Sequence, residues 1–300
     1  MLRAEAGRAS LRNWRSLSVF LSICLFLLGC KNRQANPASK ISDDPKKLEI
    51  ARAMTMFYGN FDANRQTSSV TFSKTDSARV SGEPMIIRPL FHVFSSDANV
   101  PTFVLLTYAV PARDEEYYCH ACAPTLGMAV FTQKDSKWIL TASNRVVTDA
   151  GGFGKPPKDV ELVEIGSNRH AVQIKDVDDA GGETTAVLLL FVPWKDTVNL
   201  ALERVIGDDD EGMCDPKGLP CYSNHRAVAF LHNPDADYND IELKLVGTDL
   251  PASDKPRVWT VRKVSGVEIL KFEDGKYIQV SRSGDLTGVD RVVAKRESLK

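Results

Sequence analysis

The apolar residues of the chain fall into three patterns: one long run near the start, one helical stretch, and a series of short runs. Beyond residue 60, runs rich in β-branched and aromatic residues alternate with turn residues, a pattern typical of β-strands. Together they predict a mainly β body. The clearest runs lie at 102–110, 127–133, 137–143, 185–192, 198–206, 227–231 and 241–247.

Short turns connect several of these runs. Residues 133–136 and 193–196 each separate two consecutive runs, and Asp274-Gly275 joins two further ones as a tight hairpin. Such short connections favour antiparallel pairing, because parallel neighbours need a long crossover. We therefore predict antiparallel meanders that form a sandwich, a barrel or an irregular propeller-like body.

A single N-terminal helix is expected before the strands. Asp44 and Pro45 predict its start, since Asp caps free backbone N–H groups and Pro fits the first turn. Gly59 predicts its end. Four residues between these signals have the spacing of one helical face: Leu48, Ala51, Met54 and Tyr58.

The first thirty residues combine a cationic head, an apolar run and a terminal cysteine. Residues 17–28 are apolar apart from two serines, and this run is shorter than the ~20 residues that a helix needs to cross a bilayer. The arrangement is typical of an export signal whose positive end stays on the cytoplasmic side. The head contains one acidic residue, Glu5, and four arginines: Arg3, Arg8, Arg12 and Arg15.

The signal ends in "LLGC", residues 27–30, which resembles the lipobox of bacterial lipoproteins. The resemblance implies that residues 1–29 are removed and that Cys30 is acylated, so that membrane lipid holds the mature N-terminus. Leu28 departs from the motif, because a smaller residue is more usual there. Lys31 stands at the second mature position. In this family, the absence of an acid at that position implies a lipid-anchored protein of the outer membrane that faces the periplasm.

The mature chain divides into a tether and a body. Residues 30–44 are polar and predict a flexible tether, followed by a mainly β globular body over residues 45–300. Four features of this body, taken together, resemble a loose set of uncharacterised bacterial exported proteins: the stretch "CHACAPTLGMAVF", the strand around Trp138, the loop "DAGGFGKPP" and the later cysteine pair, Cys214 and Cys221. The resemblance implies a β-rich exported body and no particular activity.

Four cysteines lie in the body, as two local pairs. In the oxidising surroundings that follow export, we predict two local disulfides, Cys119 with Cys122 and Cys214 with Cys221. The first bridge requires a turn, because two strand residues three apart face opposite sides. Disulfide pairing between the two segments stays open. A four-cysteine zinc site and a redox dithiol are the alternatives to structural disulfides. The wide spacing of the second pair and the strand-like run after the first argue against them.

Carboxylates in turns offer a candidate calcium site. One loop has oxygen-bearing residues at alternating positions, although it lacks the glycine and the closing glutamate of an EF-hand. Its candidate ligands are Asp235, Asp237, Asn239, Asp240 and Glu242. No other cofactor is expected from the sequence.

The sequence carries no strong catalytic motif, and neither an HExxH nor a GxSxG pattern occurs. A formal net charge of −1 with interspersed charges gives no basic face for nucleic acid. We expect a membrane-anchored cell-envelope lipoprotein that binds or scaffolds an envelope protein or a glycan. The alternatives are a metal-assisted hydrolase that uses histidines and loop carboxylates, and an inhibitor of an exported enzyme that presents the loop 214–221.

Overall fold

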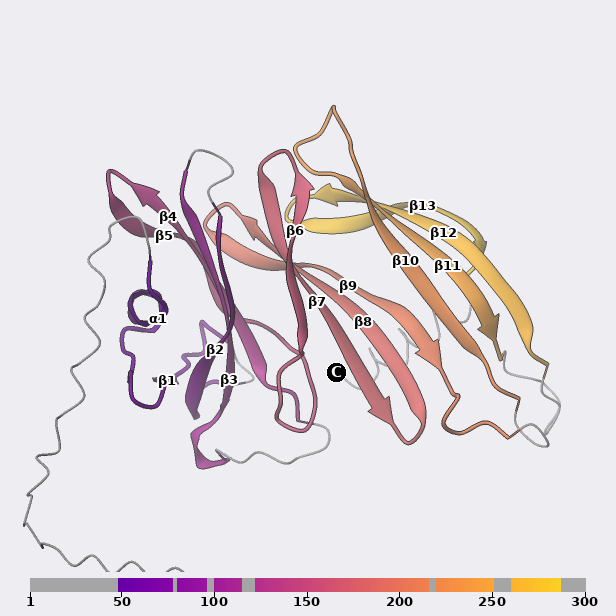
Figure 1. Ribbon diagram of the computed structural model, residues 1–300, viewed down its shortest axis with the longest axis horizontal. Helices are drawn as coiled ribbons and strands as arrows, with labels where there is room; N and C mark the ends of the chain where they lie inside the picture. The colour runs from indigo at the N-terminus through magenta and orange to yellow at the C-terminus, as the bar shows by residue number, and fades with distance from the viewer. Residues whose placement is uncertain are drawn as a thin grey trace, which may run out of the picture. The chain divides into compact units, whose positions relative to one another are not determined.

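The computed structural model describes residues 48–77, 80–95, 100–114, 122–215, 220–250 and 260–286. The export signal, Cys30 and the tether all lie outside this part of the chain. The described residues form one α-helix, one short 3-10 helix and thirteen strands, in the order that Figure 1 colours from indigo to yellow. None of the helices within these ranges is long and apolar enough to cross a membrane. The mainly β prediction is therefore confirmed.

The bounds of the elements are as follows. The helix is α1 (Ile50–Tyr58), and the 3-10 helix is η1 (Ala112–Asp114). The strands are β1 (Ser68–Thr71), β2 (Pro84–Ser95), β3 (Thr102–Pro111), β4 (Thr125–Lys134), β5 (Lys137–Asp149), β6 (Asp159–Gly166), β7 (Arg169–Ala180), β8 (Glu183–Trp194), β9 (Thr197–Asp209), β10 (Ser223–Leu231), β11 (Asp240–Asp249), β12 (Arg262–Glu273) and β13 (Lys276–Asp285).

The strands form three consecutive antiparallel meanders: an N-terminal one (β1–β5), a middle one (β6–β9) and a C-terminal one (β10–β13). All three meet at β9. One edge of β9 pairs with β8, and the other edge pairs with β10 near its end. A single parallel bridge, Ser143 to Thr197, joins β9 to β5. The path from β1 to β13 is therefore an open sheet with a branch at β9.

Three clusters of buried apolar side chains hold the meanders together. The helix cluster packs α1 against the N-terminal meander and includes Met54, Phe57, Phe103, Leu105 and Phe131. The central cluster lies mainly between the N-terminal and middle meanders and includes Val104, Met128, Val130, Val172, Leu189 and Phe191. The C-terminal cluster lies between the middle and C-terminal meanders and includes Ile165, Leu188, Leu190, Leu243 and Leu270.

Strand β8 explains why the run at 185–192 is apolar without alternation. Successive residues of a strand face opposite sides of the sheet. Leu189 and Phe191 enter the central cluster, whereas Leu188 and Leu190 enter the C-terminal cluster. Both faces of β8 are therefore buried, and full burial of each such side chain contributes about 1.5–3 kcal/mol.

Helix α1 ends where the sequence predicts but begins later. Gly59 has a φ of 86°, and its N–H bonds the Thr55 carbonyl at 2.8 Å, which closes the helix. Glu49 precedes the first turn in extended backbone and makes no side-chain cap. The start predicted at Asp44 and Pro45, which lie outside the described residues, was thus too early. Leu48 is 3% exposed and packs in the helix cluster, so core contact rather than a capping side chain positions the entry.

Three hairpins predicted from turn residues are confirmed by the pairing of β4 with β5, β8 with β9, and β12 with β13. Strands β1, β2, β6 and β7 were not predicted. In β2, the register shifts between Pro89 and Phe91, because proline cannot donate a ladder hydrogen bond. Because the proline interrupts the apolar run, the sequence pattern does not predict this strand.

The β12–β13 turn provides a test of this backbone geometry. Asp274 and Gly275 have φ values of 47° and 85°, and a Cβ on Gly275 would lie 2.3 Å from Asn199 Nδ2 and 2.9 Å from Trp194 Cδ1. We expect Gly275→Ala to lower the free energy of unfolding in urea by about 2 kcal/mol, because backbone strain and steric overlap add.

Gly82→Ala is the matched control. Gly82 has a similar φ of 80°, and a Cβ there would meet nothing within 4 Å. Gly82→Ala should lower the free energy of unfolding by about 1 kcal/mol, because only the strained backbone contributes there. Equal losses in the two variants would show that the packing against Asn199 and Trp194 does not matter.

Candidate functional site

A pocket of about 200 Å³ opens between the N-terminal and middle meanders. Its walls come from β2, Val100, β3 and β4 on one side, and from β6, the β6–β7 turn, the start of β7, β8 and the loop after β10 on the other. The lining residues are Ser95, Val100, Thr102, Val104, Met128, Val130, Thr132, Leu162, Asn168, Arg169, His170, Pro193 and Tyr238.

The floor of the pocket is apolar because of the register of β3 and β4. Val104 pairs with Val130, and both are more than nine-tenths buried in the central cluster. Two residues further along the same face, Thr102 pairs with Thr132. Since a strand places every second residue on one face, the lining passes from methyl groups inside to hydroxyl groups near the opening.

The opposite rim carries a positioned guanidinium group. Arg169 Nη2 lies 3.0 Å from the Asp237 carboxylate, and the guanidinium carbon lies 4.9 Å from the Tyr238 ring centroid. The Tyr238 ring in turn stacks on Phe272, with centroids 3.9 Å apart. Burial raises the pKa of the Tyr238 hydroxyl, and the nearby Arg169 charge opposes that rise. An ion pair and a ring face thus hold Arg169 at the pocket.

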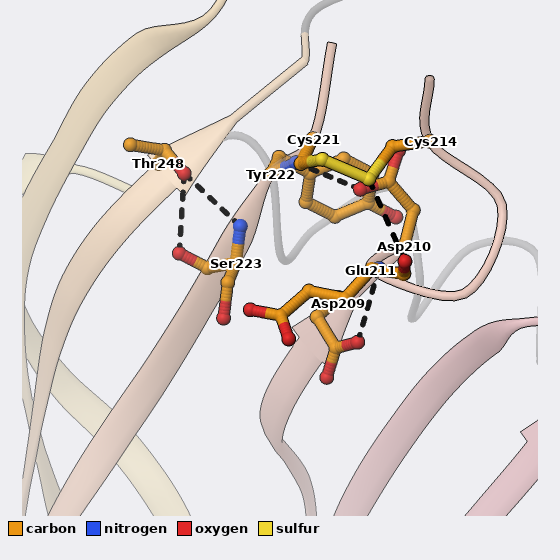
Figure 2. Close-up of a disulfide and its surroundings, with 8 residues drawn as sticks. All are labelled: Asp209, Asp210, Glu211, Cys214, Cys221, Tyr222, Ser223 and Thr248. Carbon is orange, nitrogen blue, oxygen red and sulfur yellow. Dashed lines mark hydrogen bonds between the residues drawn. A yellow bond between two sulfur atoms is a disulfide. The ribbon is translucent and has the colours of Figure 1, made fainter. Parts of the chain in front are cut away.

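A second feature lies at the tip of the β9–β10 connection, where Cys214 and Cys221 form the predicted disulfide (Figure 2). Asp210 organises the tip. Its carboxylate accepts a hydrogen bond from the Tyr222 N–H at 2.7 Å, and its carbonyl accepts from the N–H groups of Met213 and Cys214. Asp210 is 2% exposed, and its second carboxylate oxygen has no hydrogen-bond partner.

No protein-family model, curated protein or solved structure matches the chain.

The remaining candidate residues are placed as follows. Cys122 is disulfide-bonded, and Cys119, its predicted partner, lies outside the described residues.

In the calcium candidate, Asp237 faces Arg169, and Asp240 lies 3.9 Å from Lys271 Nζ. Glu242 belongs to β11, while Asp235 and Asn239 lie in the preceding loop. In the part of the chain that the structure describes, no three His, Cys, Asp or Glu side chains are grouped to hold a metal ion.

The consecutive acidic residues at the end of β9 differ in how deeply they are buried. Asp208 is 7% exposed, and burial raises the pKa of its carboxyl to about 6, with smaller contributions from Glu183, Asp249 and Asp209. A hydrogen bond with Tyr222 partly opposes this rise, and the pKa of the Tyr222 hydroxyl is itself raised. A sequence reading finds the acidic run but not the inward-facing residues, because only the register of β9 decides which carboxyls are buried.

We expect Asp208→Asn to stabilise the protein above pH 6. The folded state raises the pKa from 3.8 to about 6, so the ionised carboxyl costs stability as the pH rises through this range. The amide does not ionise, so the variant should gain roughly 1–2 kcal/mol over the wild type near pH 8 and lose that gain below pH 4. Urea denaturation across this pH range measures the difference.

Asp209→Asn, at the neighbouring position of β9, is the comparison variant. It removes only one of the smaller charge contributions to the raised pKa of Asp208, so it should change the pH profile much less than Asp208→Asn. A constant difference between Asp208→Asn and the wild type at all pH values would contradict the assignment of Asp208 as the titrating group.

Proposed function

We propose that the protein is a lipid-anchored cell-envelope lipoprotein whose β body binds a ligand. The acylated Cys30 would hold the chain to membrane lipid, and residues 30–44 would space the body from the surface, facing the periplasm. The body would act by binding or scaffolding, with the pocket between the N-terminal and middle meanders as its ligand site.

The Cys214–Cys221 disulfide is the structural observation that carries the compartment assignment. Disulfides persist in oxidising compartments outside the cytoplasm, and this one lies at the partly exposed tip of a β connection. It agrees with an N-terminal segment that has the charge, the apolar run and the cysteine of a lipoprotein signal.

The pocket supports a binding role. Apolar side chains form its floor, and a few polar groups converge at its rim, an arrangement typical of small-molecule sites. Its walls belong to paired strands of two meanders that share the central cluster. Such walls are rigid enough to select a ligand by shape.

Intact mass spectrometry of the protein extracted from its native membrane tests the anchor. We expect a chain that begins at an acylated Cys30, with the four body thiols blocked until reduction. Cys30→Ser should abolish lipid attachment. Cys24→Ser is the matched control, because Cys24 lies within the apolar run of the signal and would be removed with it.

An unprocessed N-terminus, or four cysteines that react with alkylating reagent before reduction, would contradict the proposal. Lipid attachment that survives in Cys30→Ser would place the anchor elsewhere in the chain.

A further inference from the structure

The pocket between the N-terminal and middle meanders combines an apolar floor with one positioned cation. Val104, Met128 and Val130 form the floor, and each is at most 7% exposed. Among the lining residues that the structure describes, Arg169 is the one fully charged side chain, and none of them carries a carboxylate. A ligand that enters would therefore bury an apolar part and present an acceptor to a guanidinium group.

Arg169 lies at the pocket rim with 45% of its side chain exposed, where its guanidinium group can meet a carboxylate. Asp237, which is itself 78% exposed, contacts Nη2 at 3.0 Å, and the guanidinium carbon lies 4.9 Å from the Tyr238 ring centroid. A guanidinium group has five N–H donors in a rigid fork, and a carboxylate is the small anion whose two oxygens match that fork. His170, the next residue, also lines the pocket and brings an imidazole ring to the same rim.

The volume limits the part of the ligand that the pocket can enclose. A cavity of about 150 Å³ lined by aliphatic and aromatic side chains holds one benzene molecule. The present pocket, at about 200 Å³, therefore accommodates a single ring or a short branched chain with one carboxylate. Drug-sized ligands occupy larger pockets of about 300–1,000 Å³.

We infer that this pocket binds small monocarboxylic acids, with the apolar part of the ligand between Val104, Met128 and Leu162 and its carboxylate on Arg169. This assignment rests on the proposed binding function and deepens it, because it states the chemical class of the ligand. Thr102 and Thr132 offer hydroxyl groups near the opening, where they can bond water or a polar substituent of the ligand.

Methyl NMR of the full chain in detergent, labelled at the methionine methyl groups, tests the inference. Met128 lines the pocket, whereas Met54 and Met85 are buried in the helix cluster and serve as internal controls. Benzoate should shift the Met128 signal saturably and leave the other two unchanged. Benzamide, a neutral ligand of the same shape, should bind about tenfold more weakly because it lacks the charge-assisted contact.

Two variants with one control identify the residues. Arg169→Gln should weaken benzoate about tenfold and leave benzamide nearly unaffected, whereas Val130→Phe should block both by filling the floor. Arg113→Gln, at a surface arginine that pairs with Glu83 and is 76% exposed, is the matched control and should bind like the wild type. The Met128 signal of each free variant reports whether its pocket remains folded.

The outcomes separate this inference from the proposed function. Equal binding of benzoate and benzamide would overturn the monocarboxylate class but leave the pocket as a ligand site. No shift of Met128 with either probe at millimolar concentration would overturn this inference and remove the pocket from the proposed function. The lipid anchor would still be judged independently by the mass of the mature chain.

Discussion

Replacing Arg226 with methionine is expected to lower the free energy of unfolding by about 3–5 kcal/mol. Arg226 Nη1 lies 3.2 Å from Glu268 Oε2, and the two side chains are only 2% and 5% exposed. Arg226 on β10 pairs with Leu245 of β11, and Glu268 on β12 pairs with Leu243. The ion pair thus crosses β11 on one buried face. Loss of the arginine leaves a carboxylate that neither water nor a cation can compensate.

A double-mutant cycle with Glu268→Leu tests this prediction. The double variant Arg226→Met with Glu268→Leu should recover most of the stability, because a packed apolar pair costs little once both charges are gone. Lys271→Met is the surface control. Its partner Asp240 lies 3.9 Å away, and the lysine is half exposed, so its loss should stay below about 1 kcal/mol.

Additive losses from the two single variants of the pair would show that the two charges do not stabilise one another. The measurement is urea denaturation at constant pH and ionic strength, with the slope of the transition checked in each variant.

Replacing Phe191 with alanine is expected to cost about 3–5 kcal/mol. Phe191 is fully buried in the central cluster, in the second half of β8, where β7 and β9 on either side limit collapse of the cavity. The decrease in the free energy of unfolding therefore combines the lost hydrophobic contribution of the ring with the cost of the cavity that it leaves. Thermal and urea denaturation should both report it.

Phe94→Ala is the matched control for ring size. Phe94 is 44% exposed on β2, where it makes an edge contact with Trp138. We expect Phe94→Ala to lower the free energy of unfolding by about 1 kcal/mol. Similar losses at the two positions would contradict the placement of Phe191 in a rigid, fully packed interior.

The site could be predicted only in part. The disulfide between Cys214 and Cys221 was predicted from the short separation of the two cysteines and from the expected export of the chain, and the structure contains it. The pocket could not be predicted, because Val130, Arg169 and Tyr238 come from β4, β7 and the loop after β10. No periodicity or spacing joins residues that far apart. The acidic loop at 235–242 illustrates the converse, since its carboxylates face Arg169 and Lys271 rather than one another.

By itself, the sequence determined what depends on neighbouring residues. Apolar runs specify strands, Asp274-Gly275 adopts the two positive φ values of a tight hairpin, and Gly59 ends the helix in the left-handed conformation. These are backbone preferences of a few residues, so they hold before the chain folds.

Only the tertiary structure decided which faces are buried and which residues meet. It starts α1 at Ile50 through contact of Leu48 with the core, buries both faces of β8, and brings Arg169 over Tyr238. It also separates the buried Asp208 from its neighbour Asp209. The physical reason is that burial and pairing depend on the register between strands distant in sequence, and that register is set by the packing of three meanders rather than by any local stretch.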